Sequence, residues 1–242
     1  MQRRLLRKLD LEMLLSQIEP HPSPRPSLEQ YTIPVSLAAT MLYVAAYTNN
    51  DIVGKTVLDL GCGTGRLALG AAFLGARQVV GVDIDKVAIE TAFENSMKTK
   101  LKDKVQWIAA DVNVIHRSFD TVLQNPPFGV QKSRADRKFL KKALEVGKSV
   151  YSLHKDPRRD KQLIKQLKAS RINTTSVSPT PFIERFIEEH NGKIKAVHAT
   201  LMSIPHIFSF HTKPKHEFLV NLYIIEANLT QDAKRFIEGV EK

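Results

Sequence analysis

Short apolar, β-branched runs alternate with helical stretches along most of this sequence, from residue 55 onward. The first four predicted strands are 56–60, 78–83, 105–109 and 119–124, and the helices after the first two are 66–74 and 86–97. Strands that alternate with helices predict a parallel sheet covered by helices on both faces. The alternation therefore limits the chain to a doubly wound α/β fold.

The pattern changes towards the C-terminus. Here the sequence predicts a helix at 136–145, a strand at 149–153, a basic helix at 156–169, a helix at 181–190 and two long strands at 193–202 and 217–226. No helix separates the last two strands, so they should form an antiparallel hairpin at one edge. We predict a mostly parallel, seven-stranded, Rossmann-like sheet with an antiparallel edge hairpin.

The N-terminal segment differs in composition from the rest. Leucine, methionine and isoleucine recur at helical spacing over residues 3–18, and prolines at 20, 22, 24 and 26 follow. Alternating prolines favour a stiff, extended linker. An apolar helix is expected at 34–47. We therefore divide the chain into an N-terminal helix and linker, 1–27, and a main domain, 28–242.

Cysteine usage and hydropathy restrict the compartment. Cys62 is the only cysteine, which rules out an intramolecular disulfide and a cysteine zinc site. No apolar stretch is long enough to span a membrane, and residues 1–9 lack the apolar core of a secretory signal. The histidines show no metal-ligand spacing. We expect a cytoplasmic protein without a membrane segment or a bound metal.

Positive charge is concentrated in one part of the chain. Residues 131–171 hold 14 Lys and Arg against 4 Asp and Glu, and so carry ten of the eleven net positive charges. Clustered basic side chains attract phosphates and release counterions, so a polyanion such as RNA is the expected partner. A solvated, lysine-rich helix face is the alternative interpretation.

A glycine-rich turn follows the first predicted strand. Gly61, Gly63 and Gly65 stand between strand and helix, where a backbone without Cβ atoms can approach a ligand closely. Asp83 ends the second strand and Asp111 follows the third. A carboxylate at the first position can accept ribose hydroxyls, and one at the second can meet an adenine amine. Together they predict a site for an adenosine-containing cofactor.

Three features favour S-adenosylmethionine over a dinucleotide. The Gly-Cys-Gly-Thr-Gly spacing departs from the Gly-x-Gly-x-x-Gly form that suits a pyrophosphate. Asp59 places a carboxylate beside the loop, where it suits an ammonium or sulfonium group better than a phosphate. The third feature is the end of the fourth strand, which has no role in hydride transfer. Helix capping is the alternative role for these aspartates, and we interpret Asp85 in that way.

The fourth strand ends in Asn125, Pro126, Pro127 and Phe128. Two consecutive prolines stop the strand and stiffen its end. An Asn amide oxygen and backbone carbonyls can accept both N–H groups of a planar amine, while an aromatic ring stacks on its heterocycle. A proline turn capped by Asn is the commoner interpretation of an isolated Asn-Pro pair. In this chain the Asn-Pro-Pro-Phe segment is expected beside the glycine loop, and this position favours a catalytic role.

These motifs resemble those of class I S-adenosylmethionine-dependent amino methyltransferases, and a larger set resembles the methyltransferase-like protein 5 family. The larger set comprises Leu28-Glu-Gln-Tyr31, Asn125 to Gly129, Phe139 to Glu145 and Val150-Tyr-Ser-Leu-His-Lys155, and the similarity runs from about residue 5 to residue 226. The resemblance implies N6-methylation of an adenosine in small-subunit ribosomal RNA. It also implies a small zinc-containing activator subunit at a sheet edge.

The resemblance implies the following site residues. The cofactor contacts are Gln30, Thr32, Asp59, Gly61, Gly63, Thr64, Arg66, Asp83, Ile84, Asp111, Val112 and Asn125, and the catalytic residues are Asn125, Pro126, Pro127 and Phe128. Many family members carry Tyr-Pro-Thr where this chain has Tyr31-Thr32-Ile33, so its threonine hydroxyl is displaced by one position. No general base is expected, because a cationic product amine loses its proton readily.

Basic residues near the catalytic tip are the candidate RNA contacts: Lys132, Arg134, Arg137, Lys138, Lys155, Arg158, Arg159, Lys213 and Lys215. Few aromatic residues lie among them, so they should hold backbone phosphates and leave base selection to the pocket. The alternatives are methylation of a glutamine amide in a translation factor, methylation of a transfer-RNA base, and a ribosome-assembly factor that binds RNA without catalysis.

Overall fold

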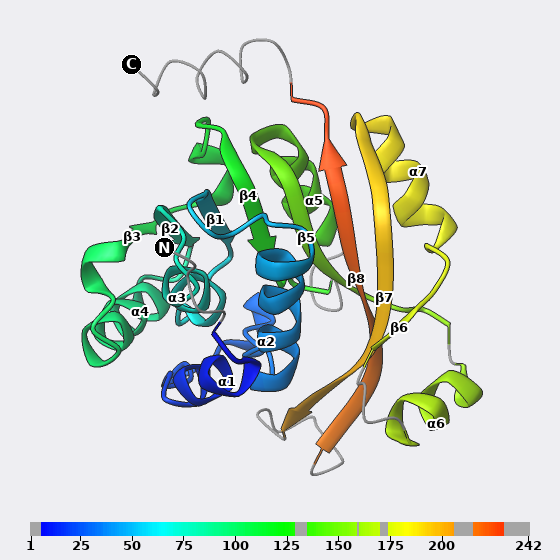
Figure 1. The fold of residues 1–242 in the computed structure, drawn as a ribbon, viewed down its shortest axis with the longest axis horizontal. Coiled ribbons are helices and arrows are strands. Elements are labelled where there is room, and N and C mark those ends of the chain that lie inside the picture. The colour runs from blue at the N-terminus through cyan, green and yellow to red at the C-terminus, as the bar shows by residue number, and fades with distance from the viewer. Residues whose placement is uncertain (1–5, 129–134, 159, 170–173, 206–214, 230–242) are drawn as a thin grey trace.

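The structure is a computed structural model that describes residues 6–128, 135–158, 160–169, 174–205 and 215–229. Its centre is one twisted sheet of eight strands in the order β3-β2-β1-β4-β5-β8-β7-β6 (Figure 1). The strands are β1 (Thr56–Leu60), β2 (Gln78–Asp83), β3 (Val105–Ala109), β4 (Phe119–Gln124), β5 (Gly147–Lys155), β6 (Thr174–Ser176), β7 (Gly192–Pro205) and β8 (Lys215–Ala227).

Strands β1 to β5 run parallel, and β8 pairs antiparallel with β5 and β7. Only nine residues, 206–214, separate β7 from β8, which is too few for the crossover that parallel neighbours need, so these two strands pair antiparallel. In the parallel part, all carboxyl ends meet at one edge of the sheet. The glycine loop after β1 and the Asn-Pro-Pro-Phe tip after β4 lie there side by side, since β1 and β4 are hydrogen-bonded neighbours.

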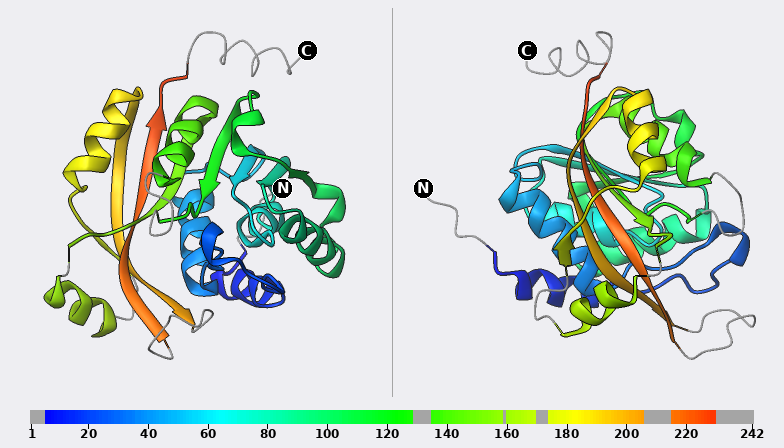
Figure 2. Two further views of the ribbon diagram at one scale, coloured as in Figure 1. Left: turned by 180° about the vertical axis from the view of Figure 1, so that it is seen from behind. Right: turned by 90° about the vertical axis from the view of Figure 1, so that its right-hand side faces the viewer.

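Helices cover both faces of the sheet (Figure 2). One face carries α1 (Lys8–Ser16), α2 (Val35–Tyr43) and α3 (Arg66–Phe73), whose apolar residues join one buried cluster. The opposite face carries α5 (Ala135–Val146) and α7 (Pro181–Glu189), which form the second cluster. The other α-helices of the described residues are α4 (Lys86–Lys98) and α6 (Lys161–Ala169).

The predicted fold class is confirmed, with one strand more than expected. The additional strand, β6, has only three residues and pairs with β7, so its own sequence carries little strand signal. The basic helix begins at Lys161 instead of residue 156, because Asp156 is buried at the end of β5 and its backbone N–H bonds to Leu219. In the described part of the chain, no helix is both long and apolar enough to cross a bilayer.

Candidate active site

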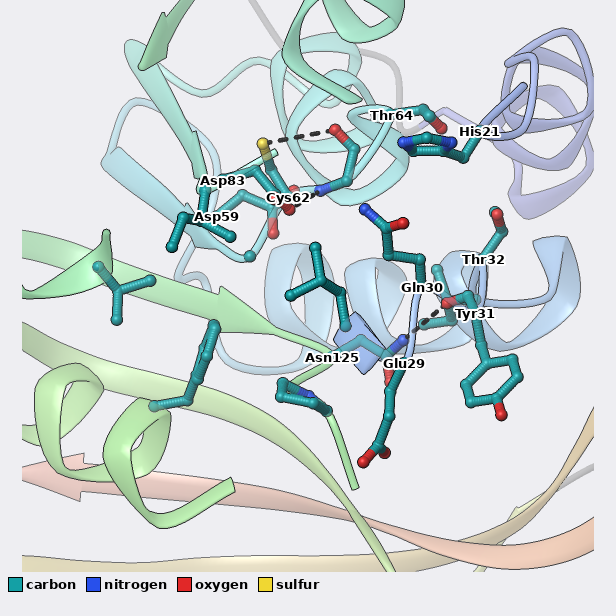
Figure 3. Close-up of a pocket in the computed structure, with 18 of the residues that line it drawn as sticks. His21, Glu29, Gln30, Tyr31, Thr32, Asp59, Cys62, Thr64, Asp83 and Asn125 are labelled. Carbon is teal, nitrogen blue, oxygen red and sulfur yellow. Dashed lines mark hydrogen bonds between the residues drawn. The ribbon is translucent and has the colours of Figure 1, made fainter. Parts of the chain in front are cut away.

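A cavity of about 260 Å³ opens at the carboxyl ends of the parallel strands. Its wall contains every residue predicted to contact the cofactor: Gln30, Thr32, Asp59, Gly61, Gly63, Thr64, Arg66, Asp83, Ile84, Asp111, Val112 and Asn125. In Figure 3, Asn125 and Glu29 lie on one side of this space, Asp59, Asp83 and Cys62 lie on the other, and Gln30 lies between them. The structure thus brings together residues that are up to 95 positions apart in the chain.

The glycine loop has the backbone that its sequence predicts. Gly61, Gly63 and Gly65 have φ angles of 71°, 52° and 89°, a region that favours glycine. A Cβ on Gly65 would lie 2.5 Å from the Trp107 ring, so this glycine also permits close packing of α3 against β3. Gly63 faces open space, which leaves its backbone accessible to a ligand.

Two carboxyl groups lie behind the loop. Asp59 is buried, and its oxygen accepts a hydrogen bond from the Ala68 N–H at 2.9 Å. Burial raises its pKa to about 7. Asp83 accepts from Gly63 N–H at 2.8 Å and from Asp85 N–H at 2.9 Å, and burial raises its pKa as well. A bound ligand with a positive charge or with hydroxyl donors would stabilise the ionised form of both carboxyl groups, so both can bind such a ligand.

Asp111 is paired across the mouth of the cavity. Its carboxylate lies 2.7 Å from the Lys138 ammonium of α5, and this contact holds the pKa of Asp111 below its ordinary value. Lys138 was predicted as an RNA contact, but it also lines the cavity. Val112 is buried beside Asp111, whereas Ile84 is 59% exposed and presents an apolar surface at the mouth. An adenine ring fits between apolar groups of this kind.

Two further predicted cofactor contacts, Gln30 and Arg66, are bonded to the N-terminal segment or to the residue that holds it. The Gln30 amide donates to Asp85 at 2.6 Å, and its oxygen accepts from Arg25 N–H at 2.7 Å. The Arg66 guanidinium donates to the carbonyls of Ile33 at 2.6 Å and Ile18 at 3.1 Å. Both side chains hold the N-terminal segment against the cavity. Asp85 also caps α4 through Val87 N–H, as predicted.

The catalytic tip presents one unused acceptor. The Asn125 amide nitrogen lies 3.5 Å from the carbonyl oxygen of Tyr31, to which it donates. Its side-chain oxygen is buried and has no hydrogen-bond partner among the described residues. A buried acceptor without a donor is unfavourable unless a ligand supplies one. The cavity at Asn125 is therefore suited to a group with N–H donors.

These features fit S-adenosylmethionine. The open glycine backbone and the Asp59 carboxyl suit its amino-acid part, Asp83 suits its ribose, and Asp111 with Val112 and Ile84 suits its adenine. The assignment of single residues to these contacts stays a prediction.

Comparisons with known proteins agree with this geometry. A family model described as ribosomal protein L11 methyltransferase (PrmA) matches residues 38–126. An uncharacterized protein of Methanocaldococcus jannaschii is 38% identical over 234 residues, which cover 92% of this chain and 95% of that protein. The rRNA N(6)-adenosine-methyltransferase METTL5 of Danio rerio is 41% identical over 157 residues, 62% of this chain and 75% of that protein.

The chain belongs to the METTL5 family of RNA methyltransferases. A crystal structure of a candidate RNA methyltransferase from Pyrococcus horikoshii supports this, with a TM-score of 0.76 and 34% identity over 93% of this chain and 100% of that one. The resemblance that the sequence suggested is thereby confirmed, and so are the class of enzyme and its cofactor. This METTL5-family protein uses S-adenosylmethionine.

Beside the tip of this METTL5-family protein, Phe218 of β8 makes two contacts that the sequence did not predict. The rings of Phe128 and Phe218 meet edge to face with 5.5 Å between centroids. The Lys155 ammonium lies 5.3 Å from the centre of the Phe218 ring. Phe218 belongs to β8 and lies 90 positions from Phe128 in the sequence. The two rings come together because β8 pairs with β5, and the sequence alone does not show this contact. Phe218 therefore supports the ring that is expected to stack on the target base.

The predicted RNA contacts are spread around the site. Arg137 lies over the ring of Phe182 at 4.3 Å, and Lys155 is exposed at the end of β5. The Arg158 guanidinium is bonded to the buried carboxylate of Asp156 at 2.7 Å. Residues 132, 134, 159 and 213 lie outside the described residues, and of Lys215 the structure describes only its place at the start of β8. The described residues hold no cluster of His, Cys, Asp and Glu that could bind a metal.

Proposed function

We propose that this protein methylates the N6 amine of an adenosine in small-subunit ribosomal RNA. The observation that carries the proposal is the buried, unpartnered oxygen of Asn125 at the wall of the cofactor cavity. An adenine amine supplies the N–H donor that this oxygen lacks. The described relatives support the same reaction, since METTL5 of Danio rerio is named an rRNA N(6)-adenosine-methyltransferase.

The residues of the tip act mainly by orientation. The Asn125 oxygen and the Pro126 carbonyl accept the two N–H groups of the amine, and the stiff proline pair keeps these acceptors in place. Phe128 stacks on the base, a contact worth about 1–3 kcal/mol. Holding two reactants close together in the reactive orientation lowers the activation barrier by roughly 7–11 kcal/mol. When bound, S-adenosylmethionine supplies an electrophilic methyl group.

RNA is favoured over a protein substrate. The similarity to ribosomal protein L11 methyltransferases in the matched family model is confined to residues 38–126, which form the cofactor-binding core. The basic segment and the β5 signature lie beyond that match, and they supply the ammonium groups of Lys138 and Lys155 beside the tip. A base in a duplex cannot enter a cavity of this type, so the target must be unstacked.

Incubation with methyl-labelled cofactor tests the proposal directly. The purified protein is given small-subunit RNA, transfer RNA and ribosomal proteins in separate reactions, and labelled RNA is digested to nucleosides. We expect the transferred label in N6-methyladenosine from small-subunit RNA, at the reduced rate of a chain without its activator. Label in glutamine or in transfer RNA alone would contradict the proposed substrate.

We further propose a small activator subunit at the β3 edge of the sheet. Strand β3 is one of the two end strands of the sheet that the described residues form, so one side of its backbone faces no neighbouring strand of that sheet. Phe93 and Met97 on the adjacent α4 are 52% and 48% exposed. An apolar surface beside an open strand edge suits a partner that adds a strand. Full solubility and activity of the isolated chain would contradict this requirement.

A further inference from the structure

The segment that joins α1 to α2 crosses the cofactor cavity as a strap, which we define as residues 18–33. Three side chains hold it, one from α3 and two from α4 and its N-cap. Asn95 bonds to both the N–H and the carbonyl of Glu19, at 3.0 Å and 3.1 Å. Arg66 donates to the carbonyls of Ile18 and Ile33, near the two ends of the strap. The third side chain is Asp85.

Asp85 makes the most concentrated of these contacts. One carboxylate oxygen, Oδ2, receives Nε2–H of His21 at 3.2 Å, the Arg25 guanidinium at 2.8 Å and the Gln30 amide at 2.6 Å. The other oxygen, Oδ1, caps α4. The Asp85 side chain is only 3% exposed. Burial alone would raise its pKa, but the hydrogen bonds from Arg25 and Gln30 outweigh burial and lower it to about 2.

Hydrogen bonds within the strap also fix the three donor groups. Ser23 N–H donates to Nδ1 of His21 at 3.1 Å, which leaves the proton of a neutral ring on Nε2, directed at Asp85. The Gln30 oxygen accepts from Arg25 N–H. The strap is thus cross-linked internally at the same place where it is attached to Asp85. Release of one donor weakens the hold on the others.

The strap is at the same time a wall of the cavity. His21 and residues 27–33 line it, and the carbonyl of Tyr31 accepts from the Asn125 amide. Gln30 is one of these lining residues and lies near Asn125 in Figure 3, while its amide nitrogen donates to Asp85 at 2.6 Å. The position of these groups therefore depends on the attachment at Asp85.

We propose that Asp85 is a positioning residue of the cofactor site, which acts by clasping the strap against the cavity through His21, Arg25 and Gln30. This inference rests on the use of S-adenosylmethionine and is independent of the RNA that is methylated. Because the clasped strap forms part of the cavity wall, cofactor binding and closure of the strap stabilise each other. The helix-capping role of Asp85 is separate, since it uses the other oxygen.

Asp85→Asn tests the clasp while keeping the cap. The Asn oxygen can still accept Val87 N–H, but its amide cannot accept from the three strap donors. We expect S-adenosylhomocysteine to bind roughly tenfold more weakly by calorimetry, because hydrogen bonds to a charged group are lost. Asp103→Asn, at an exposed aspartate, should bind as the wild type does.

Endoproteinase GluC reports the strap directly, without RNA and without turnover. Glu29–Gln30 is a cleavable bond within the strap, whereas Glu19 precedes Pro20 and is resistant. Cleavage after Glu29 should be slow in the wild type, slower with S-adenosylhomocysteine, and several-fold faster in Asp85→Asn. Mass spectrometry of the fragments identifies the bond that is cut.

Three variants on the strap side keep the test valid if Asp85→Asn does not fold. His21→Ala, Arg25→Ala and Gln30→Ala leave Asp85 and its cap intact, and each should weaken binding and speed cleavage in the same direction. Arg25→Lys should recover part of the loss. Ligand binding within twofold of wild type in Asp85→Asn, with Glu29–Gln30 still protected, would overturn the proposal. Cofactor binding and strap protection in the wild-type protein, with loss of both in Asp85→Asn and no RNA methylation, would instead contradict the proposed function alone.

Discussion

Asn125 contributes two polar atoms to the site, and their environments differ. The nitrogen has Tyr31 as a partner, whereas the oxygen has none among the described residues. Asn125→Ala should therefore lower methyl transfer by about 100-fold or more, the cost of losing one oriented catalytic hydrogen bond. The affinity for S-adenosylhomocysteine should change less than threefold. Filter-binding of labelled RNA and calorimetry measure the two effects.

The outcome separates catalysis from structure. A loss of cofactor affinity as large as the loss of transfer would mean that Asn125 shapes the cavity instead of holding the amine. Thr32→Ala serves as a comparison, because this residue lines the same cavity and is expected to contact only the cofactor. Its effect should appear in cofactor affinity first.

Asp59 gives a pH dependence of cofactor binding. Its pKa of about 7 in the free protein means that the carboxyl is largely neutral below that pH. A bound ammonium group favours the carboxylate, so binding of S-adenosylhomocysteine should tighten as pH rises, by roughly tenfold between pH 6 and pH 8 at most. 5′-Methylthioadenosine lacks the ammonium group and should show a much flatter profile. Titration calorimetry of both ligands, and of Asp59→Asn, distinguishes the two.

The residues that the sequence alone places beside the cavity are those whose signal is local. The glycine loop, Asp83 and Asn125 follow directly from strands whose apolar pattern is clear, and all of them line one cavity. The clasp was not predictable in this way, because His21 and Gln30 lie 64 and 55 positions from Asp85. The sequence identified Asp85 only as a helix cap, which accounts for one of its oxygens.

At the level of elements, β5 connects the catalytic strand to the terminal hairpin. Ser152 in β5 accepts from the Gln124 amide at 2.8 Å, immediately before the catalytic tip, and bonds to His154 at 2.7 Å. At the end of β5, Lys155 lies over Phe218, which meets Phe128. This strand therefore supports the tip in two ways, through a polar contact and through an aromatic one.

Phe218→Leu tests the aromatic support. The edge-to-face pair is worth about 0.5–1.5 kcal/mol, so transfer efficiency on RNA should fall about threefold to tenfold. Cofactor affinity should stay unchanged, because Phe218 is not part of the cavity wall. Phe128→Leu should have the larger effect, and the double variant should lose less than the product of the two single losses.

The matched control is Phe73→Leu at the end of α3, since this ring packs against the same apolar cluster away from the tip. If Phe73→Leu reduces transfer as much as Phe218→Leu does, the effect reflects general packing. Steady-state kinetics on RNA at saturating cofactor give the comparison.

The observed strand ends differ from the predicted ones because strand pairing extends the strands beyond their sequence patterns. The two terminal strands were predicted at 193–202 and 217–226, but β7 and β8 extend to Gly192–Pro205 and Lys215–Ala227 because each continues the ladder of the other. Likewise β5 exceeds its predicted 149–153 by two residues at each end through pairing with β4 and β8. Such extensions depend on tertiary context, which a single segment does not carry.

For the whole molecule, the buried polar groups near the tip link stability to pH. His154 is buried with 4% exposure, and burial lowers its pKa to about 4 from an ordinary value near 6.5. Between these values the unfolded chain binds a proton that the folded protein excludes, so stability is lost as pH falls. The loss due to His154 alone should be about 2 kcal/mol between pH 7 and pH 5.

Urea unfolding of His154→Gln and of the wild type at pH 7 and pH 5 measures this loss in the free energy of unfolding. Glutamine can still bond to Ser152 but does not titrate, so the variant should lose about 2 kcal/mol less than the wild type over that interval. His116→Gln, at an exposed histidine, should follow the wild type. Equal pH dependence in all three proteins would mean that His154 gains a proton in the folded state, and the tip would then rest on a charged contact with Ser152 instead of a neutral one.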